Sequence, residues 1–173
     1  MKLLLLLLTA LQLSAGVLLS PYEVLHSTFG DDITITEKNM LLKKAQKQRI
    51  QKAARTKLNS SIVRTYKIEK NKQHLAYAIL LSNKIRSKNG VYLYTINAQD
   101  VLESIEIVAF NEPLEYMPNN TWKQQFSDVP TNQHLNIPKN VSTITGATLS
   151  ARSITESANI AMQIYNVVLK AKK

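Results

Sequence analysis

Four segments with the composition of β-strands follow one another between residues 62 and 110, separated by short polar connections. They are rich in β-branched and aromatic residues, which favour strands. Because a short connection can join only antiparallel neighbours, the segments predict an antiparallel meander. The predicted strands are 62–68, 75–80, 91–96 and 102–110, with turn signals at 70–72, at Asn89-Gly90 and at 97–100.

Helical patterns precede and follow the predicted sheet. Ser20-Pro21-Tyr22-Glu23 has the spacing of a capping box with proline at the first helical position, which predicts a helix over 21–29. After a brief strand at 33–36, a basic stretch of strong helix formers predicts a helix over 37–57. Apolar residues near the C-terminus recur every three or four positions, which predicts an amphipathic helix over 150–170. We therefore expect an α+β fold: an antiparallel sheet meander flanked by helices, with a long C-terminal amphipathic helix.

The first residues have the features of an export signal. Met1-Lys2 is a short basic start, residues 3–8 are an unbroken leucine run, and Ser14-Ala15-Gly16 provides small residues for a signal peptidase. We expect a signal peptide over 1–16; the alternative is an uncleaved membrane anchor over 3–19, at the short limit for a span. Either segment places the rest of the chain outside the cytoplasm, in the periplasm.

The composition excludes several kinds of chemistry. The 173 residues include no cysteine, which excludes disulfides, thiolate metal sites, iron–sulfur clusters and cysteine nucleophiles. The three histidines are scattered without metal-ligand spacing, so we expect no bound metal. Any redox function must therefore come from a bound organic cofactor.

Positive charge is concentrated between residues 37 and 58, where eight Lys or Arg residues face Glu37 alone. A solvated helix face is the simplest interpretation of this stretch. Two functional alternatives are steering of an acidic cytochrome and contact with anionic lipid headgroups. The export signal and the lack of aromatic residues within the basic run argue against nucleic-acid binding.

The sequence Thr145-Gly146-Ala147-Thr148-Leu149-Ser150-Ala151 lies where the C-terminal helix is expected to begin. A helix N-terminus offers unpaired backbone N–H groups and the positive end of the helix dipole, and both favour phosphate. An ordinary N-cap would use the same residue types. Small residues beside a hydroxyl suit a tight or covalent phosphate anchor.

These residues and an upstream segment together resemble the FMN-binding domain family. That family includes the flavin-carrying subunits of sodium-pumping NADH:quinone oxidoreductases and Rnf-type complexes, and its motif is roughly Asp-x-x-Ser/Thr-Gly-Ala-Thr. The segment Phe110-Asn111-Glu112-Pro113-Leu114-Glu115-Tyr116, followed by Trp122 and Phe126, is similar to that of the family's small periplasmic members. Ser142 stands where the motif has its aspartate.

The resemblance implies a covalent flavoprotein whose FMN-binding domain spans 61–173, after an N-terminal helical segment at 17–60. Thr148 would carry FMN through a phosphoester, attached by a flavin transferase that uses FAD and a metal of its own. Backbone N–H groups from Leu149 to Ala151 would hold the phosphate. The isoalloxazine would lie against the 112–116 loop. The implied cofactor-binding residues are Thr145, Gly146, Ala147, Thr148, Leu149, Ser150, Glu112, Pro113, Glu115 and Tyr116.

The activity implied is electron transfer with a redox partner such as a cytochrome or a membrane oxidoreductase, with no catalytic acid or base. One alternative is a docking or assembly subunit of the same fold that carries no flavin. A membrane-surface protein whose binding depends on the basic helix is the third reading. For Trp122 and Phe126 we expect a structural role, as core residues that cover the open end of the domain.

Overall fold

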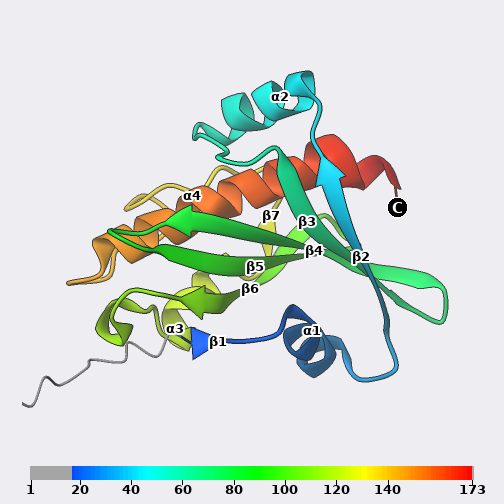
Figure 1. Ribbon diagram of the computed structural model, residues 1–173, viewed down its shortest axis with the longest axis horizontal. Helices are drawn as coiled ribbons and strands as arrows, with labels where there is room; N and C mark the ends of the chain where they lie inside the picture. The colour runs from blue at the N-terminus through cyan, green and yellow to red at the C-terminus, as the bar shows by residue number, and fades with distance from the viewer. Residues whose placement is uncertain (1–16, 173) are drawn as a thin grey trace, which may run out of the picture.

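A computed structural model describes residues 17–172, and the expected leader at 1–16 lies outside them. Its centre is a seven-stranded antiparallel sheet with the order β1-β6-β5-β4-β3-β2, in which β7 also pairs with β6 (Figure 1). The strands are β1 (Val17–Leu18), β2 (Thr34–Leu41), β3 (Ile62–Lys70), β4 (Gln73–Lys84), β5 (Asn89–Asn97), β6 (Val101–Phe110) and β7 (Val129–Pro130). The predicted α+β class and the four-stranded meander are confirmed.

Helices cover both faces of this sheet. The long α4 (Thr148–Ile164), continued by η3 (Tyr165–Leu169) and η4 (Lys170–Lys172), packs with α2 (Lys44–Ala54) on one face, as Figure 1 shows. The short α1 (Pro21–Phe29) covers the other face through buried Leu25. The hydrophobic core between the sheet and α4 is larger than the core between the sheet and α1, so the face of the sheet toward α4 contains most of the buried apolar side chains.

The prediction of a helix over 37–57 is wrong in its first part. Residues up to Leu41 form the edge strand β2, which pairs with β3 along its whole length, and the helix begins only at Lys44. The sheet edge gave the backbone of this stretch hydrogen-bond partners, and that pairing outweighed its helix propensity. The division at residue 60 stays a prediction; residues on both sides of it contribute to one sheet.

The turn between β4 and β5 lies before the predicted Asn89-Gly90 position. Those two residues already pair with Lys84 and Asn83, and the Ile85 N–H donates to the Lys88 carbonyl at 3.0 Å. The hairpin is therefore confirmed, but its turn is formed by residues 85–88.

The segment between β6 and α4 crosses the open end of the sheet. It contains η1 (Leu114–Tyr116), α3 (Asn120–Lys123) and η2 (Gln124–Phe126). Trp122 and Phe126 are buried with their ring centroids 5.1 Å apart, which confirms their predicted core role. Within residues 17–172, no helix is both long enough and apolar enough to cross a bilayer.

Candidate functional site

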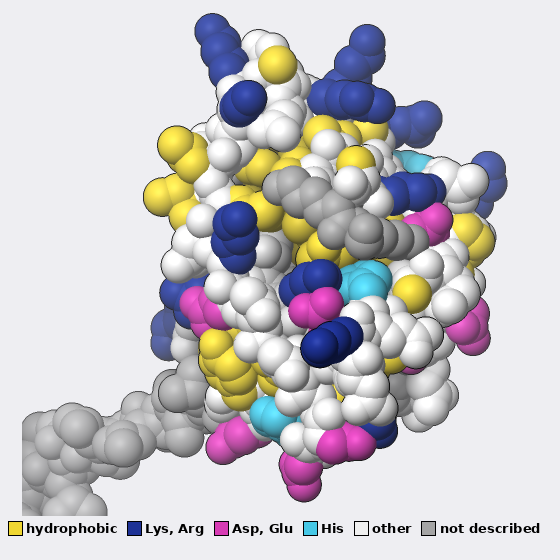
Figure 2. All heavy atoms as spheres, turned by 90° about the vertical axis from the view of Figure 1, so that its right-hand side faces the viewer, with side chains coloured by type: hydrophobic (Ala, Val, Ile, Leu, Met, Phe, Trp, Pro, Cys, Tyr) yellow, Lys and Arg dark blue, Asp and Glu magenta, His cyan; other side chains and the backbone are white. Residues whose placement is uncertain are grey.

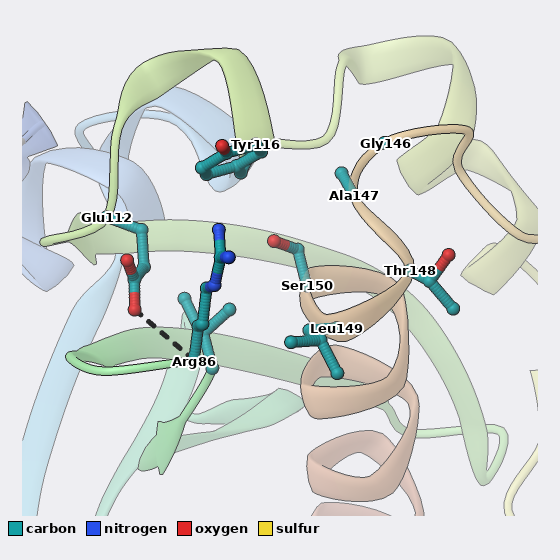
Figure 3. A pocket seen from close by; sticks show the side chains of 9 residues that line it. Arg86, Glu112, Tyr116, Gly146, Ala147, Thr148, Leu149 and Ser150 are labelled. Atoms are coloured by element: carbon teal, nitrogen blue, oxygen red, sulfur yellow. Dashed lines mark hydrogen bonds between the residues drawn. The ribbon is translucent and has the colours of Figure 1, made fainter.

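Three segments that are distant in sequence enclose a cavity of about 290 Å³ at one end of the sheet. They are the β4–β5 turn, the stretch after β6, and the start of α4 (Figure 3). The lining residues are Ile85, Arg86, Glu112, Tyr116, Gly146, Ala147, Thr148, Leu149 and Ser150. Seven of the ten predicted site residues therefore share one cavity. Their role as cofactor ligands stays a prediction.

Glu112 fixes one wall of the cavity. Its side chain is buried, with 4% exposed, and its carboxylate accepts hydrogen bonds from the backbone N–H groups of Arg86, Ser87 and Lys88 at 2.7–3.2 Å. These bonds, most of all the one from Lys88, hold the pKa of the Glu112 carboxyl below its ordinary value, although burial acts in the opposite direction. The carboxylate thus holds the 85–88 turn in place.

Arg86 is carried into the cavity by this turn. Its guanidinium lies over the Tyr116 ring, with Cζ 5.8 Å from the ring centroid, and Figure 3 shows it between Tyr116 and Ser150. Arg86 is not among the site residues predicted from the sequence. It lies 26 residues before Glu112, and no local motif indicates the hydrogen bond that joins them.

The start of α4 leaves several polar groups available. Ala147 is the N-cap and cannot cap with its side chain, and within the described chain no acceptor binds the backbone N–H groups of Thr148, Leu149 and Ser150. The expectation that Ala151 also offers its N–H group is wrong. That group donates to the Ala147 carbonyl at 3.1 Å, as the first hydrogen bond of the helix.

Ser150 is a buried hydroxyl that faces the cavity. Its side chain is 1% exposed, and its Oγ has no hydrogen-bond partner among residues 17–172. In Figure 3 it points toward the space beside Arg86. An unpartnered buried hydroxyl is costly, so its position favours a polar ligand atom in the cavity.

Thr148 is the first residue of α4 and is exposed. Its Oγ1 donates to the Ile144 carbonyl over a long 3.4 Å, and Figure 3 shows its side chain pointing away from Arg86 and Tyr116. The hydroxyl is therefore open to a modifying enzyme. Gly146, with φ of 80°, gives the chain the left-handed turn that leads into the helix.

Three predicted site residues do not line the cavity. Thr145, Pro113 and Glu115 are exposed and do not line the cavity.

Trp122 and Gln125 hold the backbone of Ser142, three residues before Thr145. The Trp122 indole N–H donates to the Ser142 carbonyl at 2.9 Å, and the Ser142 N–H donates to the Gln125 side-chain oxygen at 2.8 Å.

Within residues 17–172, no group of three or more His, Asp or Glu side chains is placed to hold a metal ion.

The decisive comparison is with protein families. Residues 87–163 match the family model of the FMN-binding domain, and this range contains every predicted site residue. Over these residues the chain is similar to an FMN-binding domain. The predicted resemblance is confirmed, and the match supports FMN as the cofactor and flavin-dependent electron transfer as the class of function. No curated protein matches the chain.

The cavity fits part of a flavin. Its hydroxyl, its free helix N–H groups and its guanidinium suit the anionic and carbonyl groups of FMN. Ligand pockets typically measure roughly 300–1,000 Å³, and this cavity of about 290 Å³ lies at the lower end of that range.

Proposed function

We propose that this protein is a periplasmic electron carrier with FMN attached through a phosphoester to Thr148. Two hydroxyl groups at the start of α4 carry the proposal. The Thr148 hydroxyl is exposed, whereas the Ser150 hydroxyl is buried, has no hydrogen-bond partner among the described residues and faces the cavity. The location follows from the leader-like sequence at 1–16. An uncleaved leader would also anchor the domain at the inner membrane.

In this proposal the chain binds the phosphate at the start of α4. The N–H groups of Leu149 and Ser150 and the Ser150 hydroxyl donate to it, and the helix dipole adds to the attraction. Arg86 and Tyr116 lie beside the ring system, where the guanidinium charge favours the more negative, reduced form of the cofactor. FMN itself supplies the one- or two-electron chemistry.

Attachment requires a flavin transferase that uses FAD as donor and a metal ion of its own. The Thr148 hydroxyl loses its proton and forms the bond to the FMN phosphorus, while the pyrophosphate bond of FAD breaks and AMP leaves. A covalent bond makes occupancy independent of free flavin, which matters outside the cytoplasm, where free flavin is scarce.

The test is to export the full chain together with a flavin transferase and to examine it after denaturation. We expect flavin fluorescence that survives denaturation and a single FMN adduct by mass spectrometry. Thr148→Val should abolish both. Thr143→Val, which removes a neighbouring exposed hydroxyl outside the cavity and at an unspecified position of the motif, should leave both unchanged. An unmodified wild-type chain, or an adduct that persists in Thr148→Val, would overturn the proposal. The mass also shows whether the chain begins at Met1 or Val17.

A second candidate function is a docking or assembly subunit that carries no flavin. The observation that favours it is Ser142, which replaces the acidic residue of the modification motif. The Ser142 side chain is exposed while its backbone is fixed by Trp122 and Gln125, so an aspartate can be accommodated there. If Ser142→Asp becomes flavinylated while the wild type stays colourless, the second candidate is supported.

The expected partners are the flavin transferase and a redox protein. The basic α2 favours an acidic partner such as a cytochrome, or contact with an anionic membrane surface, and nucleic acid is not expected. In the space-filling view, Lys and Arg side chains gather at the top of the molecule, over α2 (Figure 2).

A further inference from the structure

A second cavity, of about 250 Å³, lies further along α4 than the cavity at its start, which is lined by Arg86, Glu112 and Ser150 and is called the flavin cavity from here on. Its walls come from the end of α2, from residues 134–137 and from α4. The lining residues are Ala54, Arg55, Thr56, His134, Leu135, Asn136, Ile137, Arg152, Thr155, Glu156 and Asn159. Basic side chains from all three segments therefore converge on one space.

The charges in this cavity are not balanced from within the protein. Arg55 and Arg152 form no ion pair among the described residues, and Glu156 is the one carboxylate in the lining. Burial, with a contribution from the Arg55 charge, lowers the pKa of His134, so its ring is mostly neutral at pH 7. Two guanidinium groups against one carboxylate leave a net positive cavity.

The walls are held in fixed positions. Asn159, 4% exposed, accepts from the Leu135 N–H and donates to the Leu135 carbonyl, both at 2.9 Å, and so ties the 134–137 segment to α4. Arg55 ends α2 with φ of 55°, a left-handed conformation that glycine usually adopts at a helix C-terminus. Arginine at this position adds a cation to the cavity, although the left-handed backbone conformation costs it more free energy than it would cost glycine.

We propose that this second cavity binds a phosphate group, with Arg55, Arg152 and His134 as its donors. A tetrahedral phosphate presents oxygens in several directions and can accept from three segments at once, whereas a planar carboxylate has only two oxygens. The volume suits inorganic phosphate or the phosphate of a lipid headgroup. The site is independent of flavin attachment at Thr148.

The test is titration of the full chain with inorganic phosphate, followed by NMR signals of the His134 ring. The other two histidines, His26 and His74, lie outside this cavity and serve as internal references. We expect saturable shifts at His134 and a rise in its pKa, because the bound anion favours the charged imidazolium. Arg55→Gln and Arg152→Gln should each weaken binding roughly tenfold, as expected for a lost charged hydrogen bond.

Arg49→Gln is the matched control, because Arg49 is exposed on the same helix, carries the same charge and does not line the cavity. Arg55 and Arg152 are exposed as well, so the control differs from them only in its position. Arg49→Gln should change the affinity less than about twofold, because Arg49 lies outside the cavity and would make no hydrogen bond to a phosphate bound there. Equal weakening by all three variants, or no saturable effect at His134, would overturn the proposal.

Vesicles of phosphatidylcholine with and without phosphatidylglycerol distinguish the source of the phosphate group. Vesicle binding that is weakened by Arg55→Gln and Arg152→Gln more than by Arg49→Gln identifies a lipid headgroup. Phosphate binding with no such vesicle effect identifies a free phosphate compound.

Discussion

At the scale of single residues, Glu112 fixes one wall of the flavin cavity. Its carboxylate joins the stretch after β6 to the 85–88 turn through three backbone N–H groups and the Ser87 hydroxyl. Together with the hydrogen bond from the Ile85 N–H to the Lys88 carbonyl, this contact holds the turn that places Arg86 beside Tyr116. The acid is therefore a positioning residue, and its effect on a bound flavin acts through Arg86.

Glu112→Gln should destabilise the protein by about 1–3 kcal/mol at pH 7. The variant replaces a charged acceptor with a neutral amide oxygen, and its NH₂ group cannot accept from the backbone N–H groups of the 85–88 turn. The folded pKa of Glu112 is lowered, so its stabilisation is present above the ordinary carboxyl pKa and is lost as the pH falls through the folded value. Chemical denaturation should show the wild type approaching the variant in acid. Glu115→Gln, at an exposed acid of the same loop, is the control and should be neutral. Equal stability of Glu112→Gln and wild type at pH 7 contradicts this role.

Ser150→Ala should act differently in the flavin-free and flavin-loaded protein. Without flavin the variant removes an unpartnered buried hydroxyl, so stability should stay the same or rise by up to about 1 kcal/mol. With flavin attached, the loss of a donor to the phosphate should lower stability by about 1 kcal/mol relative to loaded wild type. Thermal unfolding of both forms measures the difference. A loss of stability of equal size in both forms would show that Ser150 serves only packing.

At the scale of elements, the β4–β5 hairpin links the cavity to the core. Gly90 pairs with Asn83 and Phe110 on the two neighbouring strands, and the Tyr92 ring lies across it. The Tyr92 hydroxyl is 3.2 Å from Ser153 Oγ on α4, and burial raises the pKa of Tyr92 to about 12. The ring therefore connects this hairpin to the helix that begins at the cavity.

Gly90→Ala should destabilise the protein by about 1–3 kcal/mol through overpacking. A Cβ at this position would lie 2.5 Å from Tyr92 Cζ and 2.8 Å from Cε1, so the buried Tyr92 ring would have to shift. Urea denaturation measures the effect. Asn89→Ala, at the exposed neighbour on the same strand, should cost much less. If the two variants lose equal stability, the tyrosine contact is not the cause.

Local sequence patterns were enough to predict α1 and the strands β3 to β6. The capping box gave α1 its bounds of Pro21–Phe29, and alternation of strand formers placed β3 to β6. Only the start of the edge strand β2 was predicted, at 33–36; its continuation to Leu41 was not, because those residues favour a helix and the partner strand β3 begins some 20 residues later. Pairing with a distant strand is information that a local pattern does not contain.

The same distinction applies to the site. The motif at 145–151 and the 112–116 loop were recognisable as short segments, and the structure brings most of them to one cavity. Arg86 and the hydrogen bond from Trp122 to Ser142 depend on contacts between residues 20 to 26 positions apart. Neither the identity of these residues nor their spacing signals such contacts, so only the folded chain reveals them.

At the scale of the whole molecule, positive charge is distributed around the helix that begins at the flavin cavity. The formal net charge of the chain is +10, and much of it lies on α2 and its flanks. Buried Ile50 and Ala54 seat α2 on the core beside α4, so its basic residues lie on the same side of the sheet as α4. A partner drawn to α2 would therefore dock on the face of the sheet that carries α4, the helix at whose start the proposed electron-transfer site lies.

Lys52→Glu should therefore slow electron transfer to an acidic cytochrome by several-fold at low ionic strength, because steering by surface charge sets the association rate. The matched control is Lys72→Glu, in the β3–β4 turn, which changes the net charge equally at an exposed site away from α2 (Figure 1). Stopped-flow rates of the flavin-loaded proteins should differ between the two variants in dilute buffer. They should converge near 1 M salt, where the screening length falls to roughly 3 Å. Equal slowing by both variants would assign the effect to net charge alone, and α2 would then have no special part in docking.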